Sequence, residues 1–312
     1  MEHVCAFIPL MHVQVANHPE INGYRFNCGA MVSRGTPPQV SEALDRLGEQ
    51  KGFWIPCMEL STLRSAKGWL WMEADLPHPP GFGFRDLIAK EMVTKLEDIL
   101  FCISLSGCGE NVHWQFGAFC GNSRLYVVSG FLPADLPFRM PWIRAAPDVR
   151  RVPWSDATLL AADRIYGDYA VNRSNLTPRL QLALLGYATL VTMDTRSIVQ
   201  LGVRLLAAVT ALEAFFIAPG EYGFIWCDKF PPRIACARGV DDSESTEQLK
   251  RLHRVRNDMA HRGGLDESGP ISTGITAACG DAERLLRLSL AWALRNHAKV
   301  AEAFQRDEWP DA

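Results

Sequence analysis

The sequence predicts an α+β protein in which a mixed α+β domain precedes an all-α helical bundle. Two observations predict this order. Residues 1–132 alternate apolar, β-rich runs with turn signals. From Trp154 onward, apolar residues recur every three or four positions, with short connections between the segments, which is typical of a bundle. The predicted domains are therefore residues 1–132 and 154–312, with 133–153 as a linker.

The first domain is predicted mainly from strand-like segments. These are residues 4–15, 24–32, 53–60, 69–75, 112–119 and 124–132. Asn22-Gly23 and Gly121-Asn122 supply turn signals between neighbouring strands. Residues 39–51 and 84–105 have helical spacing instead. The result is an α+β domain that we expect to sense a trigger or to position a substrate.

The predicted linker, residues 133–153, is rich in proline and arginine. Proline interrupts helices and strands, so this segment is not expected to form a regular element. Its arginines alternate with Phe138 and Trp142, which leaves two interpretations. The aromatic rings pack on a domain surface, which we favour, or the segment contacts RNA phosphates and bases.

The bundle is predicted from six helical segments. They are residues 155–170, 178–192, 195–217, 229–238, 246–262 and 280–304. Ser155 and Thr195 suit N-cap positions, and Pro178 suits a first helical turn. In the segment 246–262, one apolar stripe comprises Leu249, Leu252, Val255 and Met259.

Composition limits the possible functions. The net charge is −3 and the isoelectric point is about 6.3, which excludes a protein that coats nucleic acid non-specifically. Any nucleic-acid contact must come from a local basic patch. The nine cysteines include no Cys-x-x-Cys pair, which predicts reduced thiols in the cytoplasm and no metal site. We expect no signal peptide and no membrane-spanning segment.

Arg256 and His261 lie with four residues between them, in the helix that ends before Gly263-Gly264. This pair resembles the R-x4–6-H motif of the HEPN superfamily, in particular its Apea-like branch. The segment 201–217 resembles that family's "LEA" helix, and 281–296 resembles its closing helix. The resemblance covers the C-terminal half. It implies a metal-independent endoribonuclease without a cofactor, which leaves a 2′,3′-cyclic phosphate.

Those residue types suit this chemistry. Cleavage needs a group that transfers protons to or from the RNA oxygens, and the imidazole of His261 does so near neutral pH. The guanidinium of Arg256 can donate two hydrogen bonds to a phosphate. Asn257, one turn before His261, could hydrogen-bond the imidazole and fix its tautomer.

Helix geometry separates these two groups. Arg256 and His261 lie about 140° apart around an ideal helix. A long arginine side chain, a loosened last turn or a second copy of the helix would have to close this gap. In the HEPN family two motifs form one composite cleft, so the resemblance implies a homodimer. The alternative for His261 is a favourable charge position at a helix C-terminus.

Glu213 is a charge within an apolar helix and therefore needs a partner. Either a structural arginine pairs with it, or it orients Arg256 or His261. Asp258 faces solvent or pairs with a neighbouring arginine. The candidate RNA-binding residues are Arg254, Arg262 and His253.

The predicted function is a HEPN-type endoribonuclease in a bacterial defence or toxin role, with tRNA as a candidate substrate. Both the role and the substrate are implied by the resemblance alone. The alternative is a non-catalytic bundle that binds RNA, a nucleotide or a protein partner. A third possibility is a scaffold whose bundle only dimerises.

Overall fold

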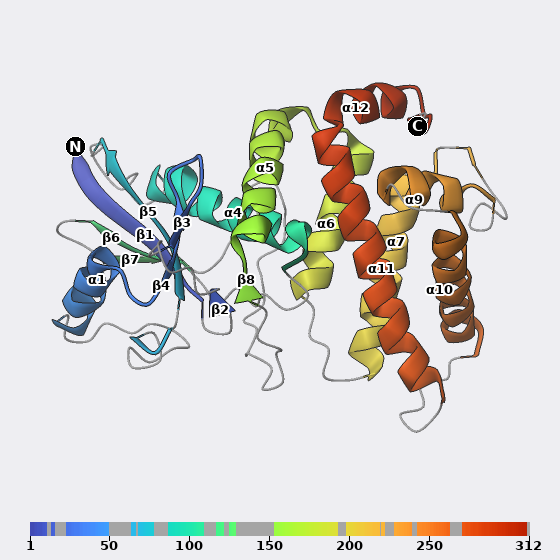
Figure 1. Ribbon diagram of the computed structural model, residues 1–312, viewed down its shortest axis with the longest axis horizontal. Helices are drawn as coiled ribbons and strands as arrows, with labels where there is room; N and C mark the ends of the chain where they lie inside the picture. The colour runs from blue at the N-terminus through green and yellow to red at the C-terminus, as the bar shows by residue number, and fades with distance from the viewer. Residues whose placement is uncertain are drawn as a thin grey trace. The chain divides into compact units, whose positions relative to one another are not determined.

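The chain forms two compact units, Met1–Tyr166 and Gly167–Ala312 (Figure 1). The computed structural model describes residues 1–10, 14–15, 23–49, 64–66, 68–77, 87–108, 117–121, 125–128, 153–192, 198–218, 220–221, 228–238, 242–262 and 270–310. Nearly all of the predicted linker, residues 133–153, lies outside the described residues, as does the strand predicted at 53–60. Each unit is therefore considered separately.

Among the described residues of the first unit, six strands form one antiparallel sheet in the order β3-β4-β5-β1-β6-β7. The strands are β1 (Glu2–Pro9), β3 (Gly23–Arg25), β4 (Met31–Arg34), β5 (Gly68–Leu76), β6 (Gly117–Gly121) and β7 (Leu125–Val128). A separate parallel pair joins β2 (Gln14–Val15) to β8 (Pro153–Trp154). β1 lies inside the sheet and is buried without interruption from Val4 to Pro9, as expected for a strand covered on both faces.

The segment 24–32 was predicted as one strand, and the structure divides it into β3 and β4. Phe26 donates its backbone N–H to the carbonyl of Ala30, and Gly29 donates to Phe26. Gly29 has φ of 91°, a conformation that glycine adopts without steric strain. Gly23 also has to be glycine, because a Cβ there would lie 2.0 Å from the Val32 carbonyl oxygen.

Two helical segments complete the first unit. Helix α1 (Pro38–Glu49) agrees with the predicted 39–51, and the predicted 84–105 corresponds to a helical stretch made of η1 (Ala89–Val93), α4 (Thr94–Ile103) and η2 (Ser104–Cys108). The apolar face of α4 is fully buried, because Leu96, Ile99 and Ile103 have no exposed surface.

Helix α5 (Asp156–Asn172) explains why the division falls after Tyr166 and not at residue 154 as predicted. The carboxylate of Asp163 accepts hydrogen bonds from the Asn27 backbone N–H at 3.1 Å and from the Asn27 side-chain amide at 2.9 Å. It also accepts one from the Tyr24 hydroxyl at 3.3 Å. The N-terminal part of α5 is therefore bound to the β3–β4 hairpin.

The second unit is helical, as predicted. Its helices are α6 (Pro178–Thr192), α7 (Ile198–Phe216), α9 (Phe230–Arg238), α10 (Asp242–Arg262), α11 (Pro270–Arg295) and α12 (His297–Gln305), after the short η3 (Arg173–Asn175). Helix α11 contacts α6, α7, α9 and α10 and is the centre of the bundle. The helix predicted at 280–304 is two helices, because α11 ends at Arg295 and α12 follows Asn296.

Two contacts fix α7 in this bundle. A Cβ added at Gly186 of α6 would lie 2.4 Å from the Cβ of Ala211, so the two helices approach closely at this glycine. Arg204 of α7 forms an ion pair with Glu283 of α11, and both residues are less than 10% exposed. Among the described residues, no helix is both long and apolar enough to cross a bilayer.

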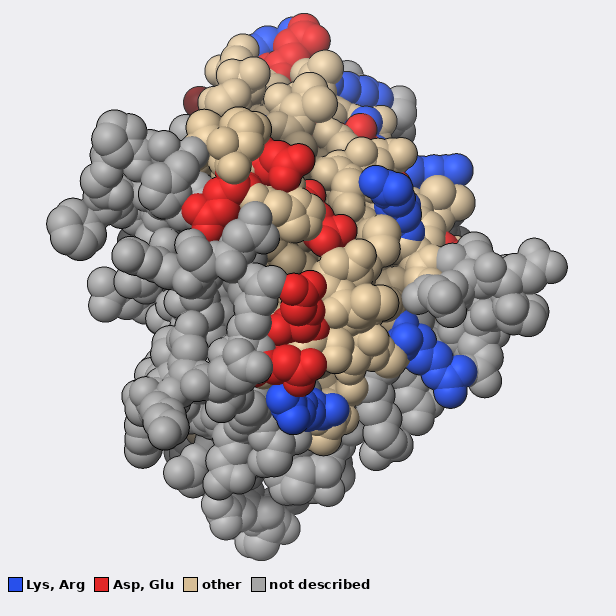
Figure 2. Space-filling view, turned by 90° about the vertical axis from the view of Figure 1, so that its left-hand side faces the viewer, with Lys and Arg blue, Asp and Glu red and all other residues tan. Residues whose placement is uncertain are grey.

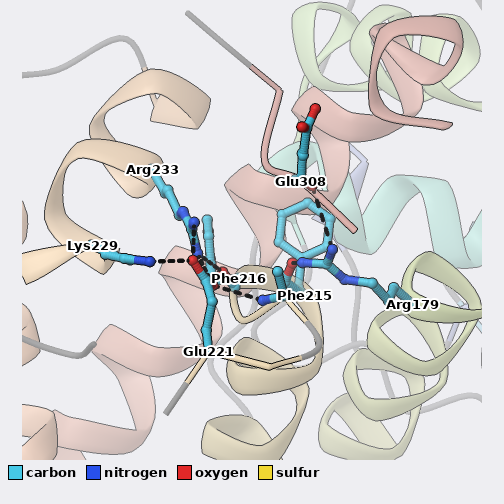
Figure 3. A network of polar contacts seen from close by, with 8 residues as sticks. Arg179, Phe215, Phe216, Glu221, Lys229, Arg233 and Glu308 are labelled. Atoms are coloured by element: carbon cyan, nitrogen blue, oxygen red, sulfur yellow. Dashed lines mark hydrogen bonds and ion pairs between the residues drawn. The ribbon is translucent and has the colours of Figure 1, made fainter. Parts of the chain in front are cut away.

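The C-terminal end of α7 lies in a network of charged side chains (Figure 3). Arg179 donates to the Phe215 carbonyl at 3.0 Å, and Arg233 donates to the Phe216 carbonyl. These bonds satisfy carbonyls that have no partner within the helix. Glu221 accepts from Arg233 at 2.7 and 2.8 Å, and these bonds hold the pKa of its carboxyl well below its usual range.

Candidate functional site

The predicted motif lies in the C-terminal half of α10, which continues without a break to Arg262. Leu249 and Leu252 are buried, and Val255 lies beside Gly274 of α11. The apolar stripe predicted from the sequence therefore faces the bundle, and the polar residues between its members lie on the other side of the helix.

Three polar side chains of α10 form a connected group. Arg256 donates from Nη1 to Oδ1 of Asn257 at 3.2 Å. The amide nitrogen of Asn257 lies 3.2 Å from Nε2 and 3.4 Å from Nδ1 of His253, one turn earlier. All three residues are partly exposed. We call Arg256, Asn257 and His253 the α10 polar group.

The sequence-predicted site is therefore described only in part. Arg256 and Asn257 are adjacent and in contact, as their positions require. Asn257 was expected to contact His261, whereas its described contacts are with Arg256 and His253. His261 belongs to α10 by its backbone, but its side chain lies outside the described residues, as does that of Arg262.

The role of His253 was underestimated from the sequence, where it was assigned only to RNA binding. The signal was present, because a histidine and an asparagine four residues apart lie on the same side of a helix. What the sequence did not indicate is that the Asn257 side chain turns toward the preceding turn and not toward the following one.

Basic residues surround the α10 polar group. The exposed ones on this helix are Lys250, Arg251 and Arg254. Lys250 pairs with Glu247 at 2.9 Å, and Arg251 joins α10 to α11 through Asp281 at 2.6 Å. Asp258 is half-buried on the same helix. The α10 surface therefore carries the local positive charge that contact with RNA phosphates would require.

The face of the molecule shown in Figure 2 has a different character. Acidic side chains form a group in the middle of its described surface, and lysine and arginine side chains lie around them. On β1 and β5, His3 lies 3.0 Å from both Glu73 and Asp75. These hydrogen bonds raise the pKa of His3, with the bond to Glu73 as the largest cause. A surface of this kind does not attract a polyanion.

Glu213, predicted to need a partner, is half-buried on α7. Its partner was predicted to be a structural arginine or a residue of the motif, and this stays a prediction. The buried charge on α7 whose partner is seen is Arg204, paired with Glu283. Arg204 already interrupts an apolar run in the sequence, which was the available signal.

No metal is implied by the arrangement of possible ligands. Among the described residues, no group of three or more histidine, cysteine, aspartate or glutamate side chains is placed to hold a metal ion. The described cysteines are free thiols. Cys279 donates to the Leu201 carbonyl at 3.3 Å, and burial raises the pKa of its thiol to about 12.

Comparison with known proteins adds no relative to this picture: no protein-family model, curated protein or solved structure matches the chain.

Proposed function

We propose that this protein is a metal-independent endoribonuclease of the HEPN type, in which the second unit cleaves RNA through attack of a 2′-hydroxyl on the adjacent phosphate. The observation that carries the proposal is the α10 polar group, which joins a guanidinium, an amide and an imidazole on one helix. The resemblance of the Arg256–His261 segment to the HEPN motif supports the same chemistry.

In this proposal Arg256 holds the phosphate. A guanidinium only donates hydrogen bonds and stays charged, so it stabilises the negative charge that develops on the phosphate oxygens. The contact with Asn257 restrains its side chain, which lowers the conformational entropy lost on binding. His261, in the last turn of α10, transfers a proton.

RNA is the substrate that the charge of α10 suits. Lys250, Arg251 and Arg254 are exposed beside the polar group and would meet the phosphates on either side of the cleaved bond. A second copy of the chain completes the site, because Arg256 and His261 diverge by about 140° on one helix. The first unit then senses a trigger in the cytoplasm, and tRNA is the candidate target; both parts rest on the family resemblance.

The test is a cleavage assay with total RNA in EDTA. Wild-type protein is compared with Arg256→Ala and His261→Ala, and with Glu247→Gln as a matched control on the same helix. We expect each alanine variant to lose about 100-fold or more of the rate, the usual contribution of such groups. The control should retain it, because Glu247 forms only an exposed ion pair. Equal cleavage by all four proteins would refute the assignment.

A second candidate function is RNA binding without cleavage. The exposed basic side chains of α10 favour it independently, because electrostatic attraction to phosphates needs no proton transfer. In this case wild-type protein would shift RNA in a gel without cutting it. His261→Ala would bind equally well, and removal of Arg254 would weaken binding and its dependence on salt.

A further inference from the structure

The proposed cleavage reaction requires two proton transfers. One group takes the proton from the 2′-hydroxyl, and another gives a proton to the departing 5′-oxygen. One imidazole cannot be both at the same moment. The motif supplies His261, and the α10 polar group contains a second imidazole, His253.

The amide of Asn257 has a defined orientation. The guanidinium of Arg256 can only donate, so the amide atom 3.2 Å from its Nη1 is the oxygen. The NH2 end of the amide therefore faces His253. It lies almost equally far from Nε2 and Nδ1, at 3.2 and 3.4 Å. Because Cε1 lies between these two nitrogens, an atom placed in this way sits over the ring and not in its plane.

Two consequences follow for the imidazole. The NH2 end is the positive end of the amide dipole, and over the ring it favours an imidazole without a positive charge. A neutral imidazole is the form that accepts a proton. The amide contact also does not use the in-plane direction of either ring nitrogen, which is the direction along which an imidazole accepts a proton.

We propose that His253 takes the proton from the RNA 2′-hydroxyl, with Asn257 as the positioning residue that orients it. This assignment rests on the ribonuclease function proposed above. The 2′-oxygen then bonds to phosphorus, the bond from phosphorus to the 5′-oxygen breaks, and that oxygen takes a proton from protonated His261. Exchange with water returns both imidazoles to their starting forms.

The helix geometry fits this division of roles. His253 is separated from Arg256 by a single amide group, so a phosphate bound to the guanidinium lies next to this imidazole. His253 and His261 are eight residues apart, which places them about 80° apart around the helix and about 12 Å apart along it. They can therefore approach a phosphodiester from opposite ends.

A substrate with one cleavable linkage separates the two roles. We would use mixed-sequence 2′-O-methyl RNA with a single 2′-hydroxyl, followed by either the normal 5′-oxygen or a 5′-sulfur. A thiolate leaves without being protonated. His253→Ala is expected to lose about 100-fold or more on both linkages, whereas His261→Ala should lose as much on oxygen and recover on sulfur. His253→Gln, which keeps a polar side chain, should behave as His253→Ala.

Controls distinguish chemistry from folding. Wild type and the variants should bind fully 2′-O-methylated RNA equally and unfold at the same temperature, because His253 is partly exposed. Asn257→Leu should lower the maximal rate more than it weakens binding. The proposal is overturned if His253→Ala cleaves total RNA like wild type, or if sulfur restores its rate. Failure of wild-type protein to cut total RNA would refute the ribonuclease function itself.

Discussion

Gly186→Ala tests how closely α6 and α7 pack. The new methyl carbon would lie 2.4 Å from the Cβ of Ala211, whereas carbon atoms in contact lie about 3.5–4.0 Å apart. The helices must therefore separate by about 1–1.5 Å, because neither methyl group has a rotamer that moves it away. Overpacking of this kind destabilises by about 1–3 kcal/mol.

An opposing effect has to be subtracted. Alanine is about 1 kcal/mol better than glycine inside a helix. The net expectation for Gly186→Ala is a loss of about 1–2 kcal/mol in the free energy of unfolding, measured by urea titration. Gly280→Ala is the matched control, since a Cβ there meets nothing within 4 Å and only the gain in helix propensity remains.

A double variant makes the test specific. In Gly186→Ala with Ala211→Gly, the two methyl groups no longer collide. The double variant should therefore be more stable than the sum of the single effects predicts, by about 1 kcal/mol or more. The proposed close packing would be wrong if Gly186→Ala raised stability as much as Gly280→Ala does.

Two further predictions concern charged contacts. Glu283→Gln leaves Arg204 buried without an anionic partner and should lower the free energy of unfolding by about 3–5 kcal/mol, whereas replacing both residues by apolar ones should lower it much less; equal losses would contradict this. His3 has a raised pKa, so its pairing with Glu73 and Asp75 stabilises the fold below its unfolded-state pKa and is lost as pH rises through the folded-state value. His3→Gln should therefore lower the urea midpoint at pH about 6 by an amount worth less than about 1 kcal/mol and leave it unchanged at pH about 9.

Much of the second unit follows from local sequence patterns. The helix at Pro178–Thr192 begins and ends where the apolar spacing and the first-turn proline predict it. The apolar stripe of α10 faces the bundle for the same reason. The break between α11 and α12 was missed, because helical spacing continues across Asn296.

The candidate site was predicted as a set of positions and only partly as a set of contacts. The sequence placed Arg256, Asn257 and His253 within two turns of one helix, which follows from their spacing. It did not determine which neighbour the Asn257 side chain contacts. Positions four residues before and after it are equally near on a helix, so the choice depends on rotamers and on the guanidinium that fixes the amide.

The sequence alone determined the helices of the second unit and the polar side of α10, because both depend on residues within a few turns of one another. Tertiary structure decided where the first unit ends, since Asp163 binds Asn27, more than a hundred residues earlier. It also decided which acid pairs with Arg204. Such pairings are chosen by the free energy of burying distant groups together, and no local period of the sequence records that choice.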